Sequence, residues 1–87
     1  TVSPALVAGM GAAAALAKDQ MAADAEHING LWDRAAELFA HWDLNGSASR
    51  RWFGNLNVRL DGLDVARLIS DCRTVMFSAG SACASAA

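Results

Sequence analysis

The residues SPALVAGMGAAAALAKDQMAADAEHINGLWDRAAELFAH, at positions 3–41, decide the fold because they predict one long helix. Their larger apolar residues recur mostly at steps of three or four, which is the period of one helical face. Ser3 and Pro4 form a helix-start signal, since a Ser side chain can cap free N–H groups and a proline at the first helical position loses no hydrogen bond. From Pro4 to about His41 such a helix would run about 55 Å, longer than a compact domain of this size requires. We therefore expect a helix that bridges two bodies.

The residues after this helix predict a small mixed layer. Residues 45–49 combine Asn, Gly and Ser as in a turn. In residues 56–60 large apolar side chains alternate with polar ones, which predicts a strand with one buried face. Asp61 can cap a second helix, and residues 74–77 predict a second strand. With a short strand near Trp42, this order indicates an α+β fold with a split βαβ layer.

Length and charge exclude several classes of protein. A chain of 87 residues forms at most one small domain, so a complete multidomain enzyme is excluded. Seven Lys and Arg against nine Asp and Glu give a net charge of -2 and no basic stripe, which argues against nucleic-acid binding. The uncharged first 17 residues lack the basic start of a signal peptide and are too short for a membrane span. We expect a soluble, cytoplasmic protein whose first helix is buried.

The two cysteines have opposite sequence surroundings. Residues 78–87 are small throughout and predict a mobile tail, and Cys83 lies within it in the run SACAS. A thiol gains nothing from packing there, so Cys83 is either a reactive group or an inert thiol. Cys72 continues the apolar stripe of residues 65–69 at helical spacing, which predicts a core thiol that reacts slowly. A single cysteine pair without a signal sequence is no disulfide framework and favours a reducing compartment.

The remaining candidates for chemistry have little support from spacing. His27 and His41 have no neighbour at a metal-ligand spacing, so we expect no metal site. Three tryptophans and a pair of arginines also stand out. We expect the tryptophans to pack in a core or an interface and the arginines to be solvated. These residues are Trp32, Trp42, Trp52, Arg50 and Arg51.

Nearly the whole chain resembles the cysteine desulfurases, a family of pyridoxal-phosphate (PLP) enzymes within the class V aminotransferases. The segment TVSPALVAGMG, residues 1–11, resembles the stretch that enters the family's long interdomain helix, which KDQM at 18–21 continues. NLNV at 55–58 is similar to the family's Asn-x-x-Asn-Val strand region, and residues 63–68 to the helix after it. SAGSACAS at 78–85 resembles the loop that bears the catalytic cysteine.

The resemblance implies a fold, a reaction and roles for two residues. It implies a partial PLP fold type I: residues 1–20 end the large PLP-binding domain and begin the interdomain helix, 21–77 form the first half of the small domain, and 78–87 form the mobile catalytic loop. Cys83 would be the nucleophile that takes sulfur from L-cysteine, leaving L-alanine and a persulfide for iron–sulfur cluster assembly or other sulfur transfer. Thr1 would contact the PLP phosphate of the partner subunit in a homodimer.

The sequence departs from the family at the cofactor lysine. The family binds PLP through a lysine in a Ser-x-His-Lys context, whereas Lys18 is the only lysine of this chain and matches a helix position instead. The resemblance therefore implies a fragment that is inactive alone and forms no PLP linkage. Two alternatives stay open, a helical interaction or dimerisation module and a thiol protein that accepts sulfur without catalysis. A truncated reading frame without a selected function is a third.

Overall fold

The computed structural model describes residues 1–80, and its dominant element is the expected long helix. Helix α1 runs from Pro4–Leu38, with Pro4 in its first turn as predicted. The Ser3 side chain makes no capping hydrogen bond, contrary to the prediction, and only its backbone oxygen accepts from the Val7 N–H at 3.1 Å. The helix ends at Leu38, earlier than the expected end near His41, because the backbone leaves helical geometry at Phe39.

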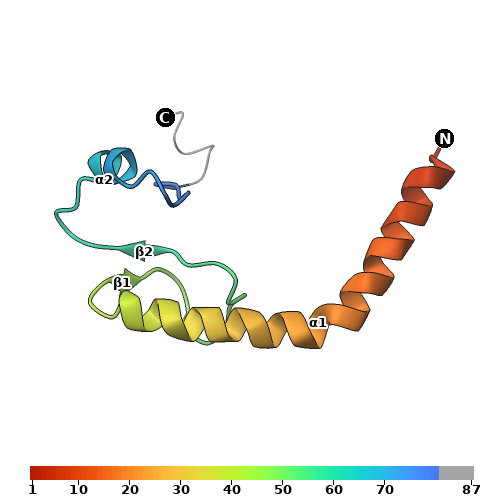
Figure 1. Cartoon of the computed structure of the whole chain (residues 1–87), viewed down its shortest axis with the longest axis horizontal. Helices are drawn as coiled ribbons and strands as arrows, with labels where there is room; N and C mark the ends of the chain where they lie inside the picture. Colours follow the sequence, from red (N-terminus) through yellow and green to blue (C-terminus); the bar gives the residue numbers. More distant parts are fainter. Residues whose placement is uncertain (81–87) are drawn as a thin grey trace.

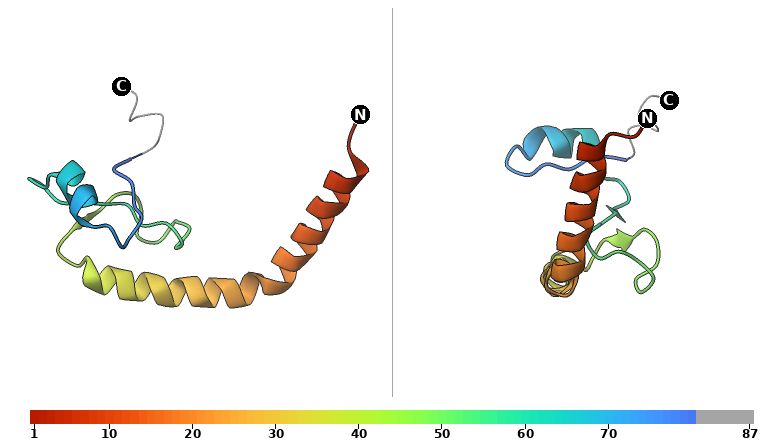
Figure 2. Two further views of the ribbon diagram at one scale, coloured as in Figure 1. Left: turned by 45° about the horizontal axis from the view of Figure 1, so that its top comes forward. Right: turned by 90° about the vertical axis from the view of Figure 1, so that its right-hand side faces the viewer.

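Helix α1 is bent, and its N-terminal part stands away from the other elements (Figures 1 and 2). The chain measures 51 × 33 × 26 Å, and its Cα radius of gyration is 17.8 Å. A compact chain of 87 residues would have a radius of about 12 Å. The extended shape agrees with the prediction of a helix longer than one small domain needs.

Two short strands form an antiparallel sheet after α1. Strand β1 covers Asp43–Leu44 and pairs with β2, Val58–Arg59, with Leu44 opposite Val58. The short strand expected near Trp42 is therefore confirmed, while the strand expected over residues 56–60 shrinks to two residues. The length of β2 is limited by its pairing with the segment around β1. The Asn45 N–H still donates to the backbone oxygen of Asn57 at 2.9 Å, but the next residue, Gly46, has a φ of 91° and turns the chain away.

Helix α2 covers Val65–Asp71 and begins later than expected. Its cap is Asp64, whose side chain accepts a hydrogen bond from the Arg67 N–H at 3.1 Å, so the prediction that Asp61 caps this helix is wrong. Gly62 lies between the two acids with a φ of 82°, and this left-handed turn keeps Asp61 outside the helix.

The strand expected over residues 74–77 is absent from the structure. These residues are irregular, and their large side chains are exposed, with Met76 at 97% of its full accessibility. A strand forms where its backbone N–H and C=O groups pair with a neighbouring strand, and the sheet of the described residues joins only β1 and β2. The arrangement is nevertheless mixed α+β, with two helices and one small antiparallel sheet among the described residues.

The described residues form no fully buried core. Partial burial is concentrated where the C-terminal half of α1 faces the loop at 45–57, and residues 1–24 are all exposed. The expectation that the first helix is buried is therefore wrong for this chain as it stands. In the described part of the chain, no helix has the length and apolar character needed to cross a membrane.

Candidate functional site

The structure does not bring the two residues implied by the resemblance together. Cys83 lies outside the described residues. Thr1 is exposed and directly precedes the part of α1 that projects away from the other elements (Figure 1).

The surroundings of Thr1 are chemically suited to a phosphate group. The first turn of α1 contains no acidic residue, and a helix N-terminus carries free N–H groups and partial positive charge. Pro4 contributes no N–H, so any donors come from the residues that follow it. The N-terminus of α1 therefore fits a phosphate contact. No other element among the described residues encloses this position.

The residues of this chain do not fit covalent attachment of PLP. Lys18 is the only lysine in the sequence, and it is an exposed residue within α1. It lines neither of the two hollows found beside α1, so its amine faces no cavity among the described residues that could enclose a cofactor. No reaction step of this chain is therefore assigned to a lysine–PLP linkage.

Cys72 is placed differently from the prediction. It follows the last residue of α2 and is exposed, and its N–H donates to the Leu68 oxygen at 2.9 Å. The apolar stripe of α2 is half-buried only at Val65 and Leu68, because this seven-residue helix ends before the stripe reaches Cys72. The interpretation of Cys72 as a core thiol is wrong.

Arg51 clamps the 45–57 loop to α1, a role that the sequence does not reveal. Its guanidinium donates to the Ser47 oxygen at 3.2 Å and to the Asn55 oxygen at 2.9 Å. The same group lies over the ring of Trp32 in α1, 4.2 Å from the centroid. Because these contacts occupy it, Arg51 is part of the fold and is not a solvated member of the Arg50–Arg51 pair.

Two of the three tryptophans pack as predicted. Trp32 meets Phe53 edge to face at 5.4 Å between centroids, and Trp42 meets Phe39 in the same way at 5.2 Å. Two shallow apolar hollows lie along this side of α1, the first of about 150 Å³. Besides residues of α1, the hollows are lined by Phe53 and Leu56 of the loop and Val58 of β2. Trp52, by contrast, is 62% exposed and covers Gly54, where an added Cβ would overlap its indole.

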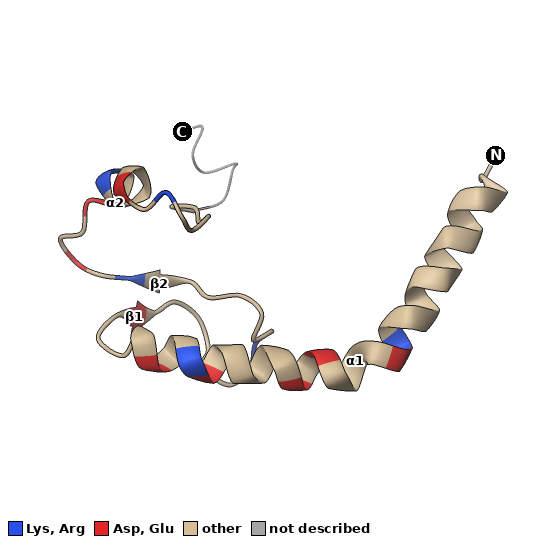
Figure 3. Cartoon of the chain, in the orientation of Figure 1, with Lys and Arg blue, Asp and Glu red and all other residues tan. Residues whose placement is uncertain are grey.

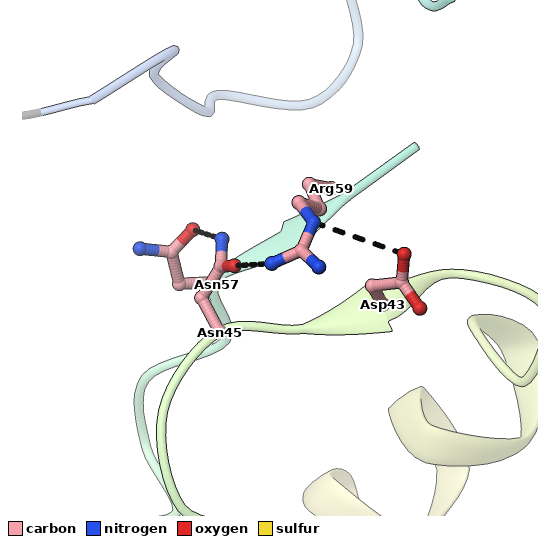
Figure 4. Close-up of polar contacts among 4 residues, drawn as sticks. All are labelled: Asp43, Asn45, Asn57 and Arg59. Atoms are coloured by element: carbon pink, nitrogen blue, oxygen red, sulfur yellow. Dashed lines mark hydrogen bonds and ion pairs between the residues drawn. The ribbon is translucent and has the colours of Figure 1, made fainter. Parts of the chain in front are cut away.

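A polar network joins the two strands on an exposed face (Figure 4). The Asn45 amide donates to the Asn57 side-chain oxygen at 3.0 Å, and Arg59 donates to the Asn45 side-chain oxygen at 3.0 Å. Arg59 also pairs with Asp43 at 3.7 Å, and both partners are more than half exposed. Because the network joins side chains of both strands, it supports the register of β1 and β2. Solvent weakens such exposed contacts, and the network forms no enclosed binding site.

Neither histidine lies in a cluster that suggests catalysis. His27 and His41 are both exposed. Among residues 1–80, no three His, Cys, Asp or Glu side chains lie close enough together to hold a metal ion.

Comparison with known proteins places nearly the whole chain within cysteine desulfurases. It is 37% identical over 83 residues to the cysteine desulfurase IscS of Colwellia psychrerythraea, covering 92% of this chain and 20% of that protein. It is 36% identical over 90 residues to the cysteine desulfurase IscS of Rickettsia africae, and 33% identical over 90 residues to that of Rickettsia bellii. Each of these two matches covers 99% of this chain and 22% of the relative.

No family model matches the sequence, and no solved structure matches the fold. The relation therefore rests on the curated relatives alone. All three share the family name that the resemblance suggested, and all three match over nearly the full chain. By sequence, the chain belongs to the cysteine desulfurase family and spans about a fifth of the length of these relatives.

Proposed function

We propose that this chain is a segment of a PLP-dependent cysteine desulfurase and that Cys83 is its sulfur-carrying nucleophile. In this role, the enzyme converts L-cysteine into L-alanine, and the sulfur remains as a persulfide on Cys83. The observation that carries the proposal is the extent of the sequence match. Because two relatives match 99% of the chain, the matched stretch includes Cys83 and the small residues around it.

The chemistry of Cys83 follows from its sequence surroundings. A thiolate is the reactive form of cysteine, and it can attack sulfur only where side chains leave room for approach. Ala82 and Ala84 flank Cys83 with the smallest chiral side chains, and Gly80 adds backbone freedom nearby. An acceptor thiolate that attacks the outer persulfide sulfur takes that sulfur and leaves Cys83 as a thiolate again.

We place the missing cofactor chemistry outside this chain. PLP acts as an electron sink in the complete enzyme. Lys18 is unsuited to hold it, so the lysine must come from polypeptide other than these 87 residues, and this chain alone is inactive. In the same proposal, residues 1–20 complete the PLP domain, with Thr1 contacting the phosphate of the partner subunit, and 21–77 give half of the small domain.

The proposed partners follow from the same assignment. They are L-cysteine as substrate, a second subunit, and an iron–sulfur scaffold or another sulfur-acceptor protein. The proposed location is the cytoplasm, where a reducing environment keeps Cys83 as a thiol.

A chimaeric enzyme tests the assignment of Cys83. Residues 1–87 of this chain replace the matching segment of the Colwellia psychrerythraea relative, and L-alanine release from L-cysteine is measured. We expect activity in this chimaera and in its Cys72→Ser variant, and loss of activity in Cys83→Ser. The PLP absorption band reports whether each chimaera is folded. A chimaera that binds PLP but releases no L-alanine, or one that stays active in Cys83→Ser, would contradict the proposal.

The chief alternative is a thiol protein that accepts sulfur without catalysis, with Cys83 in its run of small residues as the accepting thiol. The unmodified chain, incubated with an active cysteine desulfurase and L-cysteine, would then gain one sulfur atom on Cys83 by mass spectrometry. An inactive but PLP-bound chimaera together with this sulfur gain would favour the alternative over the enzyme.

A further inference from the structure

The sequence contains two Asn–Gly pairs, and the structure places them in different surroundings. Asn29 and Gly30 lie within α1, whereas Asn45 and Gly46 directly follow β1. An asparagine followed by glycine is prone to deamidation, because glycine has no side chain to hinder the approach of its backbone nitrogen. The two pairs therefore share one intrinsic reactivity, and any difference between them comes from the fold.

Deamidation of such a pair is an internal attack followed by hydrolysis. The backbone nitrogen of the glycine forms a bond to Cγ of the asparagine and loses its proton, while the side-chain nitrogen gains a proton and leaves as ammonia. Water then opens the five-membered succinimide ring. Breaking the new bond to Cγ gives aspartate, and breaking the original peptide bond gives isoaspartate, whose main chain runs through Cγ. No oxidant or reductant takes part.

Helix α1 protects Asn29 from this attack. In a helix each N–H bonds to the oxygen four residues earlier, so the nitrogen of Gly30 is engaged by the oxygen of Glu26. The succinimide ring also contains the Cα–C bond of the asparagine, so ring closure forces ψ away from its helical value of about −42°. The helix must therefore open locally first, and an opening cost of about 1.4 kcal/mol already slows the reaction about tenfold.

The second pair lies outside both described helices. No backbone oxygen of residues 1–80 accepts the Gly46 N–H, and Gly46 has a φ of 91° where the chain turns away from the sheet. The Asn45 N–H bonds to the Asn57 oxygen at 2.9 Å, but this bond lies on the N-terminal side of the Cα–C bond that must rotate. Asn29 is exposed and Asn45 half-buried, so exposure alone would predict the opposite order of reactivity.

We propose that Asn45 is a site of spontaneous modification, where attack by the Gly46 nitrogen yields isoaspartate and aspartate while Asn29 is protected. The only co-reactant is water. The proposal is independent of the proposed desulfurase activity, since it rests on the backbone and hydrogen bonds of this segment alone.

Modification removes the amide that links the two strands. The Asn45 side chain donates to Asn57 and accepts from Arg59, both at 3.0 Å (Figure 4). Isoaspartate has no side-chain NH2 and a main chain one carbon longer, so the donor to Asn57 is lost and the backbone beyond it shifts. Either product also adds a carboxylate where Asp43 already pairs with Arg59 at 3.7 Å (Figure 3, red on β1 and blue on β2). The pairing of β1 with β2 should therefore weaken.

Peptide mapping of the aged full chain tests the site. The chain is incubated in native buffer and in guanidinium chloride, and the conversion of each asparagine is followed by mass spectrometry. In native buffer we expect Asn45 to convert about tenfold or more faster than Asn29, because only Asn29 requires the helix to open. In denaturant the two rates should become similar. Equal rates in native buffer, faster conversion of Asn29, or a difference that persists in denaturant would overturn the proposal.

Two glycine variants test the identity of the attacking nitrogen. Gly46→Ala should slow the conversion of Asn45, because the new Cβ hinders the backbone nitrogen. Gly30→Ala is the matched control and should leave the Asn45 rate unchanged, since an added Cβ at either glycine meets nothing within 4 Å. Equal Asn45 rates in the two variants would contradict attack by Gly46.

The effect on the sheet is measured on the purified products. An isoaspartyl methyltransferase, which methylates isoaspartate and not aspartate, identifies the aged chain that carries isoaspartate at position 45. Its urea midpoint, followed by tryptophan emission, should lie below those of the fresh chain and of Asn45→Asp, which keeps the normal backbone length. Equal midpoints for all three would overturn the proposed weakening of the sheet.

Discussion

The guanidinium of Arg51 lies 4.2 Å from the centroid of the Trp32 ring and donates to two backbone oxygens of its own loop. The contact connects two residues that are separated in sequence by the end of α1, strand β1 and a turn. It joins the loop at 45–57 to the long helix. Stability of the small folded part should therefore depend on it.

Arg51→Lys should weaken this link while keeping the charge. Lysine has no planar fork to stack on the indole and donate to two oxygens, so we expect a loss of about 1–2 kcal/mol in the free energy of unfolding. Urea titration followed by tryptophan emission measures this change. Arg50→Lys is the matched control and should change the free energy little, since the contacts to Trp32 and Asn55 belong to Arg51. Equal losses in the two variants would contradict the clamp.

Gly54→Ala should displace Trp52. The new Cβ would overlap the indole ring, and Trp52, being 62% exposed, can swing away from Gly54 into water. We expect a shift in the indole N–H resonance of Trp52 in proton–nitrogen NMR, with little change for Trp32. Gly30→Ala is the control, because nothing lies within 4 Å of its added Cβ. An unchanged Trp52 resonance would contradict the contact.

Asp64→Ala should fray α2, whereas Asp61→Ala should not. Asp64 accepts the hydrogen bond from the Arg67 N–H, and removing such a cap costs about 1 kcal/mol. Asp61 lies beyond the left-handed turn at Gly62 and contributes no cap. Hydrogen exchange at the amide of Arg67 should accelerate about fivefold in Asp64→Ala, as that energy implies. The same acceleration in Asp61→Ala would mean that Asp61 also caps α2, and it would contradict the assignment of the cap to Asp64 alone.

The sequence predicted the parts of the fold that depend on local patterns. The period of three and four residues and the Ser3–Pro4 start indicated α1, because a helix satisfies its own backbone and needs no partner to form its hydrogen bonds. Strands differ in this respect. Residues 56–60 and 74–77 have strand patterns, but the first is paired over two residues and the second has no neighbouring strand.

The site was less predictable than the helix because its contacts are distant in sequence. Nothing near Arg51 signals that its guanidinium stacks on Trp32, since residue spacing carries no information about loops folding back. The error at Cys72 has a different cause: the apolar stripe was read correctly at Val65 and Leu68, but α2 ends one residue before the thiol. The role of Cys83 rests on the resemblance of residues 78–85 to the family's catalytic loop, and it stays a prediction.

Exposure of Cys72 predicts that it reacts freely with a mild alkylating agent. A core thiol is shielded in the folded chain and reacts much faster once unfolded, by a factor of about ten or more. Cys72 lies after the end of α2 in the exposed part of the chain, so its labelling rate in native buffer should be close to its rate in urea. Timed labelling of a Cys83→Ser variant, followed by mass spectrometry, measures both rates on one thiol. A tenfold or larger increase in urea would mean that Cys72 is buried in solution, either by the rest of α2 or by a partner that covers this end of the chain.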